Sequence, residues 1–190
     1  MNKFKYFALS KHIPIISDEA LNIIKKVIID NNYQTMLELG TAIGYSSVML
    51  SSVLKEIETI ERNKTLHEEA LKQIKLYQKE QIITARLADA LEVKPLKDKY
   101  DLIFIDAAKG QYKNYFNKFK SYLNDNGAII TDNLNFHNLE LDEVSKQTRK
   151  LITKIEKFKQ FLVDNEEFET QFINLGDGLS ISKKVIKKEN

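Results

Sequence analysis

Tyr100-Asp-Leu-Ile-Phe-Ile-Asp-Ala-Ala-Lys109 is an apolar run that ends in Asp106, and it is the most informative segment of the chain. A second apolar run, Gly127-Ala-Ile-Ile-Thr-Asp-Asn133, ends in Asp132 and Asn133. Such runs are typical of buried parallel strands, and open α/β sheets bind ligands at the carboxyl ends of their strands. Magnesium and calcium prefer carboxylate and amide oxygens. The two runs therefore predict a hard-cation site formed by Asp106, Asp132 and Asn133.

Strand-like and helix-like segments alternate on both sides of these runs, which predicts one α/β domain. The expected sheet has seven strands and is mostly parallel, with helices on both faces and a C-terminal antiparallel hairpin around Gly176-Asp-Gly178. Residues 124–127, Asn-Asp-Asn-Gly, have the composition of a turn. The expected strands are 35–39, 57–60, 81–84, 101–105, 128–131, 168–175 and 179–185, and the expected helices are 18–30, 45–54, 64–78, 113–123 and 142–164.

Composition sets outer bounds on function. The 190 residues are 43% hydrophobic and 29% charged, with a net charge of +2 and no cysteine. The lack of cysteine excludes disulfides, thiolate nucleophiles and zinc–thiolate sites. The apolar runs are too short for a membrane span, and the N-terminal one is too short for a signal peptide, so we expect a cytoplasmic protein. The ends are basic and could contact a polyanion such as RNA, or could be solvated surface; they carry Lys3, Lys5, Lys11, Lys183, Lys184, Lys187 and Lys188.

A glycine-containing turn, Met36-Leu-Glu-Leu-Gly-Thr-Ala-Ile-Gly-Tyr-Ser46, joins the first strand to the next helix. Its spacing is G-x-x-x-G, which departs from the dinucleotide pattern G-x-G-x-x-G and disfavours a nicotinamide dehydrogenase. A carboxylate in the turn, Glu38, would repel phosphate but could meet a cationic cofactor. Glu61 ends the second strand, where an acid usually accepts hydrogen bonds from ribose hydroxyls, and Asp89 could border the adenine. A nucleoside cofactor without phosphates fits this set, and S-adenosylmethionine is such a cofactor; tight packing alone is the alternative reading of the two glycines.

These motifs together resemble the cation-dependent O-methyltransferases, which include the catechol and caffeoyl-CoA O-methyltransferases. The resemblance covers about residues 12–185 and is strongest to the bacterial branch of tRNA 5-hydroxyuridine methyltransferases. It implies the Rossmann-like class I methyltransferase fold, with residues 1–34 as an N-terminal substrate-side segment and helix and residues 35–190 as the cofactor-binding core. It implies S-adenosylmethionine and Mg²⁺ as cofactors, a cation held by Asp106, Asp132 and Asn133, and Lys109 and Asp106 as catalytic residues. The implied cofactor-binding residues are Glu38, Gly40, Thr41, Gly44, Tyr45, Ser46, Glu61, Arg62, Ala88, Asp89, Asp106 and Ala107.

Two classes of substrate fit the implied site. A bound cation lowers the pKa of a hydroxyl and would hold two vicinal oxygens of a substrate. Both a 5-hydroxyuridine in a tRNA anticodon loop and a small catechol-like or caffeoyl-CoA-like metabolite offer that pair. Lys109 could accept the proton or could stay charged and stabilise the oxyanion. A homodimer is expected from the relatives, and a non-catalytic binding module is disfavoured by the complete set of site residues. RNA phosphates could meet Lys113, Arg149 and Lys150, whereas Phe136 and His137 are expected to shape the pocket.

Overall fold

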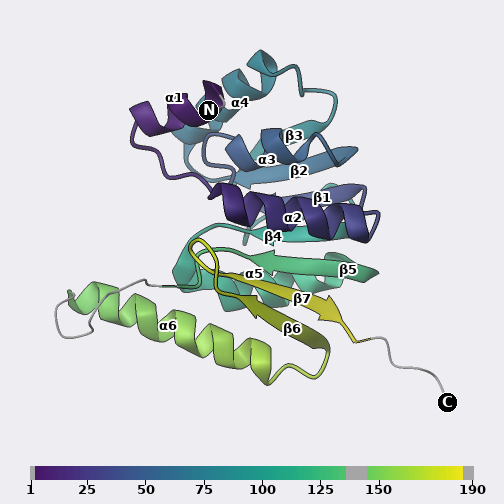
Figure 1. Cartoon of the computed structure of the whole chain (residues 1–190), viewed down its shortest axis with the longest axis vertical. Helices are drawn as coiled ribbons and strands as arrows, with labels where there is room; N and C mark the ends of the chain where they lie inside the picture. Colours follow the sequence, from purple (N-terminus) through teal and green to yellow (C-terminus); the bar gives the residue numbers. More distant parts are fainter. Residues whose placement is uncertain (1–2, 136–144, 186–190) are drawn as a thin grey trace.

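The computed structural model describes residues 3–135 and 145–185 and contains a seven-stranded sheet in the order β3-β2-β1-β4-β5-β7-β6 (Figure 1). Neighbouring strands are parallel except at β7, which runs antiparallel to both β5 and β6. The expected mostly parallel sheet with a terminal hairpin is therefore confirmed. The strands are β1 (Thr35–Leu39), β2 (Glu56–Glu61), β3 (Ile83–Leu87), β4 (Tyr100–Ile105), β5 (Leu123–Thr131), β6 (Phe168–Ile173) and β7 (Leu179–Lys184).

Helices cover both faces of the sheet, as the alternating pattern predicts. One apolar core joins the sheet to the first four helices, and a second core joins its other face to the last two. The strands are apolar on both faces because each face is covered by a helix layer. The helices are α1 (Lys3–Ser10), α2 (Asp18–Asp30), α3 (Tyr45–Leu50), α4 (Lys64–Leu76), α5 (Tyr112–Phe119) and α6 (Lys146–Val163), with short 3-10 turns η1 (Lys109–Gln111) and η2 (Lys120–Tyr122).

Two local predictions are wrong, and in both tertiary contacts override local sequence. The first helix, α1, lies in a segment where no element was expected. Its Phe4 packs against the rings of Tyr45 and Tyr77 at 5.3 and 5.2 Å. The stretch 124–127 belongs to β5 rather than to a turn. Its Gly127 is needed because a Cβ there would lie 2.7 Å from the carbonyl oxygen of Asp101.

Ligands are expected at the carboxyl edge of the sheet, at the position between β1 and β4. The strand order runs outward in opposite directions from these two neighbours, which makes this the topological switch point. All the loops that follow β1, β2, β4 and β5 open at this edge. In the described ranges, no helix is long and apolar enough to cross a membrane.

Candidate active site at the carboxyl edge

The glycine turn lies directly against the cation-site strand. Gly40 has a φ of +97°, and a Cβ on it would lie 2.0 Å from the main-chain oxygen of Asp106. No other residue type fits a backbone approach of this kind without displacement. At the end of the turn, Gly44 also has a left-handed φ, +84°, but a Cβ there would meet only Ala70 at 3.5 Å. Glycine at position 40 therefore permits the close approach of two backbone segments, whereas glycine at position 44 permits only the left-handed backbone conformation.

A cavity of about 200 Å³ opens beside Gly40 at the switch point. It is bounded by the loops that follow β1, β2, β3 and β4. Seven of the residues expected at the cofactor line it, and five further residues join them. The expected ones are Gly40, Glu61, Arg62, Ala88, Asp89, Asp106 and Ala107, and the additional ones are Ala42, Ile60, Ala90, Ala108 and Tyr115.

Glu61 is already tied into this wall. Its two carboxylate oxygens accept hydrogen bonds from the backbone N–H groups of Ala42 at 2.9 Å and Asn63 at 2.7 Å. A carboxylate has about four acceptor positions, so one remains on each oxygen for a ligand. Asp89 accepts from the N–H of Leu91 at 2.9 Å. Both acids are thereby fixed at the cavity wall before any ligand binds.

The remaining expected cofactor residues lie outside the lining of this cavity. Glu38 is fully buried and accepts hydrogen bonds from Ser46, Ser47 and Thr59, the last at 2.5 Å. Thr59 also bonds Thr41 at 2.6 Å. Burial raises the pKa of Glu38, while the three hydroxyl donors oppose that rise. Glu38 thus supports the glycine turn from its buried side. Tyr45 packs against Phe4 of α1. Both residues therefore support the turn and do not line the cavity.

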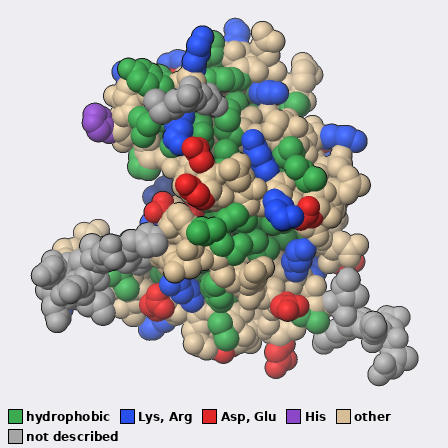
Figure 2. Space-filling view, in the orientation of Figure 1, with side chains coloured by type: hydrophobic (Ala, Val, Ile, Leu, Met, Phe, Trp, Pro, Cys, Tyr) green, Lys and Arg blue, Asp and Glu red, His purple; other side chains and the backbone are tan. Residues whose placement is uncertain are grey.

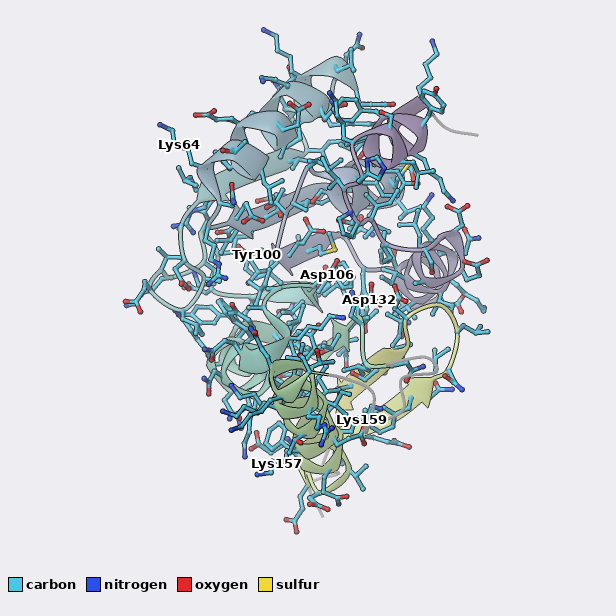
Figure 3. The ribbon with its side chains drawn as sticks, turned by 90° about the vertical axis from the view of Figure 1, so that its left-hand side faces the viewer. Lys64, Tyr100, Asp106, Asp132, Lys157 and Lys159 are labelled. Carbon is cyan, nitrogen blue, oxygen red and sulfur yellow. The ribbon has the colours of Figure 1, made fainter. Side chains whose placement is uncertain are left out.

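The predicted cation ligands converge at the ends of β4 and β5 (Figure 3). The amide nitrogen of Asn133 donates to a carboxylate oxygen of Asp106 at 3.0 Å, and its backbone N–H donates to Asp132 at 2.7 Å. Asn133 has a φ of +63°, a left-handed conformation that asparagine tolerates better than most residues. The hydroxyl of Tyr112 donates to the Asp132 carbonyl at 2.9 Å. The three side chains therefore share one small volume.

The electrostatics of this group fit a cation. Burial, followed by the charge of Glu38, raises the pKa of Asp106 to about 6. Burial, followed by the charge of Asp106, raises the pKa of Asp132 to about 7. The ammonium of Lys109 works in the opposite direction on both. Among the described residues, no three His, Cys, Asp or Glu side chains form a metal cluster, so the candidate donor set is two carboxylates and one amide. Two carboxylates that resist ionising together, next to an amide oxygen, match the donor chemistry of a hard cation.

The C-terminal hairpin clamps the segment that follows Asn133. Leu134 and Asn135 donate their N–H groups to the carbonyls of Gly178 at 3.0 Å and Asp177 at 2.8 Å. The Asn135 side chain also donates to Asn174. A Cβ on Gly178 would lie 2.5 Å from the Asn135 side chain, so the glycine permits this contact. The Gly176-Asp-Gly178 loop thus does more than reverse the chain, because it fixes the loop that carries a candidate cation ligand.

Several site residues were not found from the sequence. Tyr115, one of several aromatic residues at helical spacing that pack in the core, also lines the cavity. Lys118 donates to three carbonyls of the loop that follows Asp89, those of Ala90, Leu91 and Val93, at 2.6 to 2.8 Å. The interleaved lysines and aromatics of α5 gave no signal that separated these two from their neighbours. The polar neighbours of His67 in the sequence predict a solvated position on its helix, and this prediction is wrong because the side chain is buried. Phe136 and His137 lie outside the described residues.

Comparison with known proteins identifies the family of this chain. The model of the O-methyltransferase family matches residues 5–185. A crystal structure of a candidate caffeoyl-CoA O-methyltransferase from Staphylococcus aureus is 36% identical, with a TM-score of 0.90, and the match covers 95% of this chain and 90% of that chain. The caffeoyl-CoA O-methyltransferase of Populus kitakamiensis is 26% identical over 95% of this chain and 82% of its own length.

A more distant structure supports the fold. The O-methyltransferase from Bacillus cereus, solved in complex with SAH, is 20% identical with a TM-score of 0.80, over 95% of this chain and 88% of that chain. The family model matches residues 5–185, a range that contains all seven strands of the sheet. The chain belongs to the O-methyltransferase family.

Proposed function

We propose that this O-methyltransferase uses S-adenosylmethionine and a divalent cation, Mg²⁺ first, to methylate a hydroxyl that lies next to a second oxygen on its substrate. The observation that carries the proposal is the placement of Asp106. Its main chain packs on the glycine turn of the cofactor cavity, and its side chain bonds Asn133 in the candidate cation site. One residue therefore borders both sites, as transfer between a bound donor and a cation-held acceptor requires.

Some residues of the chain would bind the cofactor and the cation, and Lys109 would act on the proton of the substrate hydroxyl. When bound, the cofactor supplies the methyl group and the cation makes the adjacent hydroxyl more acidic. Asp106, Asp132 and Asn133 would hold the cation, and Glu61 and Asp89 would accept hydrogen bonds from the ribose and border the adenine. Lys109, on η1 directly after the Asp106 loop, would either take the hydroxyl proton or stabilise the oxyanion. Ala88, Ala90 and Ala107 would give the cavity its apolar wall.

For the acceptor, we propose 5-hydroxyuridine in the anticodon loop of tRNA. A base in that loop is already unpaired, so little energy is needed to expose it. Its 5-hydroxyl and 4-carbonyl are the vicinal pair that a cation would hold. The likeness to caffeoyl-CoA O-methyltransferases supports a second candidate, a catechol-like or caffeoyl-CoA-like metabolite. The family membership is common to both candidates and does not choose between them.

Two experiments test the proposal. For the cofactor, S-adenosylhomocysteine should raise the melting temperature with the logarithm of its excess over the dissociation constant, whereas NAD should not. For the acceptor, labelled S-adenosylmethionine is incubated with tRNA that contains 5-hydroxyuridine, with a catechol and with caffeoyl-CoA. Label in 5-methoxyuridine supports the tRNA assignment, with tRNA lacking the 5-hydroxyl as control. Label only in a small molecule moves the enzyme to the second candidate, and label in none of the three contradicts both.

A further inference from the structure

We propose that one face of α6 is the surface that binds the phosphate backbone of the RNA substrate. This inference rests on the proposed function and extends it from the reacting base to the rest of the nucleic acid. The surface consists of Lys146, Lys150, Lys154 and Lys157, called here the α6 lysine stripe.

The four lysines lie on one side of the helix. They are spaced by four, four and three residues within the 18-residue α6, and such spacings return to the same face of a helix with 3.6 residues per turn. All four are exposed. The stripe is about 16 Å long at 1.5 Å per residue. The opposite, apolar side of α6 is buried through Ile155, Phe158 and Leu162, which fixes the direction in which the stripe faces.

The stripe passes over the turn that carries Lys109. Helix α6 packs on η1, the turn that carries Lys109. A Cβ on Gly110 would lie 3.5 Å from the ammonium nitrogen of Lys154, so this lysine stands directly over the turn. Figure 1 shows α6 starting beyond the carboxyl edge of the sheet and running back alongside it. A chain held on the stripe would therefore pass beside the cavity mouth.

The helix that carries the stripe has an uneven charge balance, because α6 contains five lysines and one arginine against a single acid, Glu156. Over most of the face in Figure 2, acidic and basic side chains are interspersed. Many lysines elsewhere have acidic partners, such as Lys5 with Asp18 at 2.5 Å and Lys120 with Glu167 at 2.6 Å. Lys159, on the other side of α6 from Lys157, pairs with Glu156 at 2.9 Å (Figure 3). Within the described ranges, none of the four stripe lysines lies within ion-pair distance of an acid, so their charge remains available to a polyanion.

The path continues from α6 onto α5. A shallow depression of about 660 Å³ between these helices is lined by Lys157 and Lys113, together with the amides Asn117 and Gln160. The ammonium of Lys113 lies 4.8 Å from the ring centre of Phe161. Acids bound the depression at the C-terminal end of α6, where Asp164, Glu166 and Glu167 stand. The basic surface therefore passes over η1 at Lys154 and ends at the acids beyond α6.

A nucleic acid fits this track better than a small acceptor does. Phosphate contacts from several lysines give affinity without reading sequence. A catechol has no phosphate. A coenzyme A thioester carries phosphates only on its nucleotide part, which would engage one end of the stripe rather than its full length. The length of the stripe therefore favours RNA over a coenzyme A thioester as its ligand.

The test compares two double charge reversals in the full-length enzyme. Lys150→Glu with Lys157→Glu alters the stripe, and Lys72→Glu with Lys75→Glu on α4 makes the same change in net charge on the other face of the sheet. Binding of tRNA is measured by fluorescence anisotropy over a salt series. Each lost phosphate contact should reduce the slope of log affinity against log salt by about 0.7 to 0.9, so the stripe variant should lose about 1.5 in slope and about tenfold or more in affinity. The α4 variant should bind tRNA within about twofold of the wild type.

Turnover of caffeoyl-CoA and of a simple catechol separates this inference from the proposed function. If the wild type methylates tRNA but the stripe variant keeps its tRNA affinity and salt slope, the inference is overturned and the function stands. An equal loss in both variants also overturns it, since a general charge effect would then explain the result. If the wild type binds tRNA no more tightly than the stripe variant does and methylates only a small molecule, both the inference and the tRNA assignment fail. A stripe variant impaired only with caffeoyl-CoA assigns the surface to the thioester instead.

Discussion

Gly40 and Asp106 approach each other so closely that a Cβ atom on Gly40 would lie 2.0 Å from the main-chain oxygen of Asp106. The cofactor turn and the candidate cation site are thus joined through one backbone contact. Side-chain motion has no way of relieving a clash with that oxygen, because both partners would be backbone or Cβ atoms.

Gly40→Ala should therefore be among the most damaging single changes in the chain, and Gly44→Ala is its matched control. Both glycines have positive φ, a strain that costs a non-glycine residue about 1 to 2 kcal/mol. Only Gly40 adds a backbone clash, so its loss of unfolding free energy should exceed that of Gly44→Ala by at least about 1 to 3 kcal/mol, the range of overpacking costs. Urea denaturation measures both. Equal losses would show that the turn moves away from β4 at little cost.

The stability of the metal-free enzyme should depend on pH because of the carboxyl groups of Asp106 and Asp132. Their pKa values are raised on folding, to about 6 for Asp106 and about 7 for Asp132. A carboxyl group with a raised pKa contributes stability below its unfolded value, near 3.9, and loses it as the pH rises through the folded value. In EDTA, the wild type should thus lose stability relative to Asp132→Asn between about pH 4 and 7. Urea midpoints at several pH values test this, and a constant difference between the two proteins would contradict it.

Asp101 should show the opposite trend. Burial opposes its ionisation, but hydrogen bonds from the backbone of Gln34, the side chain of Asn124, and the backbone and hydroxyl of Thr35 outweigh it and lower the pKa of Asp101. These bonds, 2.7 to 3.0 Å long, tie β4 to the start of β1 and to β5. Asp101→Asn should cost about 1 to 3 kcal/mol near neutral pH, and the difference from wild type should shrink as the pH falls through the lowered folded value. A cost that persists unchanged in acid would show that charge is not involved.

The hairpin clamp predicts a metal-affinity effect for a residue that need not touch the metal. Asn135 bonds Asn174 through its side chain and packs against Gly178. Asn135→Ala should weaken Mn²⁺ or Mg²⁺ binding about 10-fold or more, in the range of supporting residues at metal sites. Asn174→Ala is the control, because it removes the side-chain bond but leaves the packing on Gly178. Calorimetry gives both affinities, and unchanged binding in Asn135→Ala would show that the backbone bonds of Leu134 and Asn135 hold the loop without the Asn135 side chain.

Much of this architecture could be predicted because it depends on local patterns. The apolar runs that end in Asp106 and Asp132 are visible in the sequence, and parallel strands must bring their carboxyl ends to one edge. Glu38 shows a position whose role such local patterns do not determine. An acid in a glycine turn reads equally well as a ligand or as a buried support. Only the positions of Ser46, Ser47 and Thr59 around Glu38 settle that it is enclosed.

Other features depend on contacts between distant segments. Helix α1 forms around Phe4, which packs between aromatic rings of α3 and of the residue that follows α4. Tyr115 reaches the cavity only because α5 crosses beside the loop of Asp89. Neither contact produces a periodic pattern in the sequence. Both depend on how distant segments pack in the folded chain.

The cation site is tested by the rate of methyl transfer by EDTA-treated enzyme as Mg²⁺ is added back, measured for the wild type and for Asp132→Asn. If Asp106, Asp132 and Asn133 hold the cation, the wild-type rate should be near zero in EDTA. It should rise to a plateau as Mg²⁺ is added. The cation site also predicts an Asp132→Asn protein that folds, binds S-adenosylhomocysteine and needs far more Mg²⁺ or stays inactive. Full turnover of the wild type in EDTA, or an Asp132→Asn enzyme with the same Mg²⁺ dependence, would contradict the cation site.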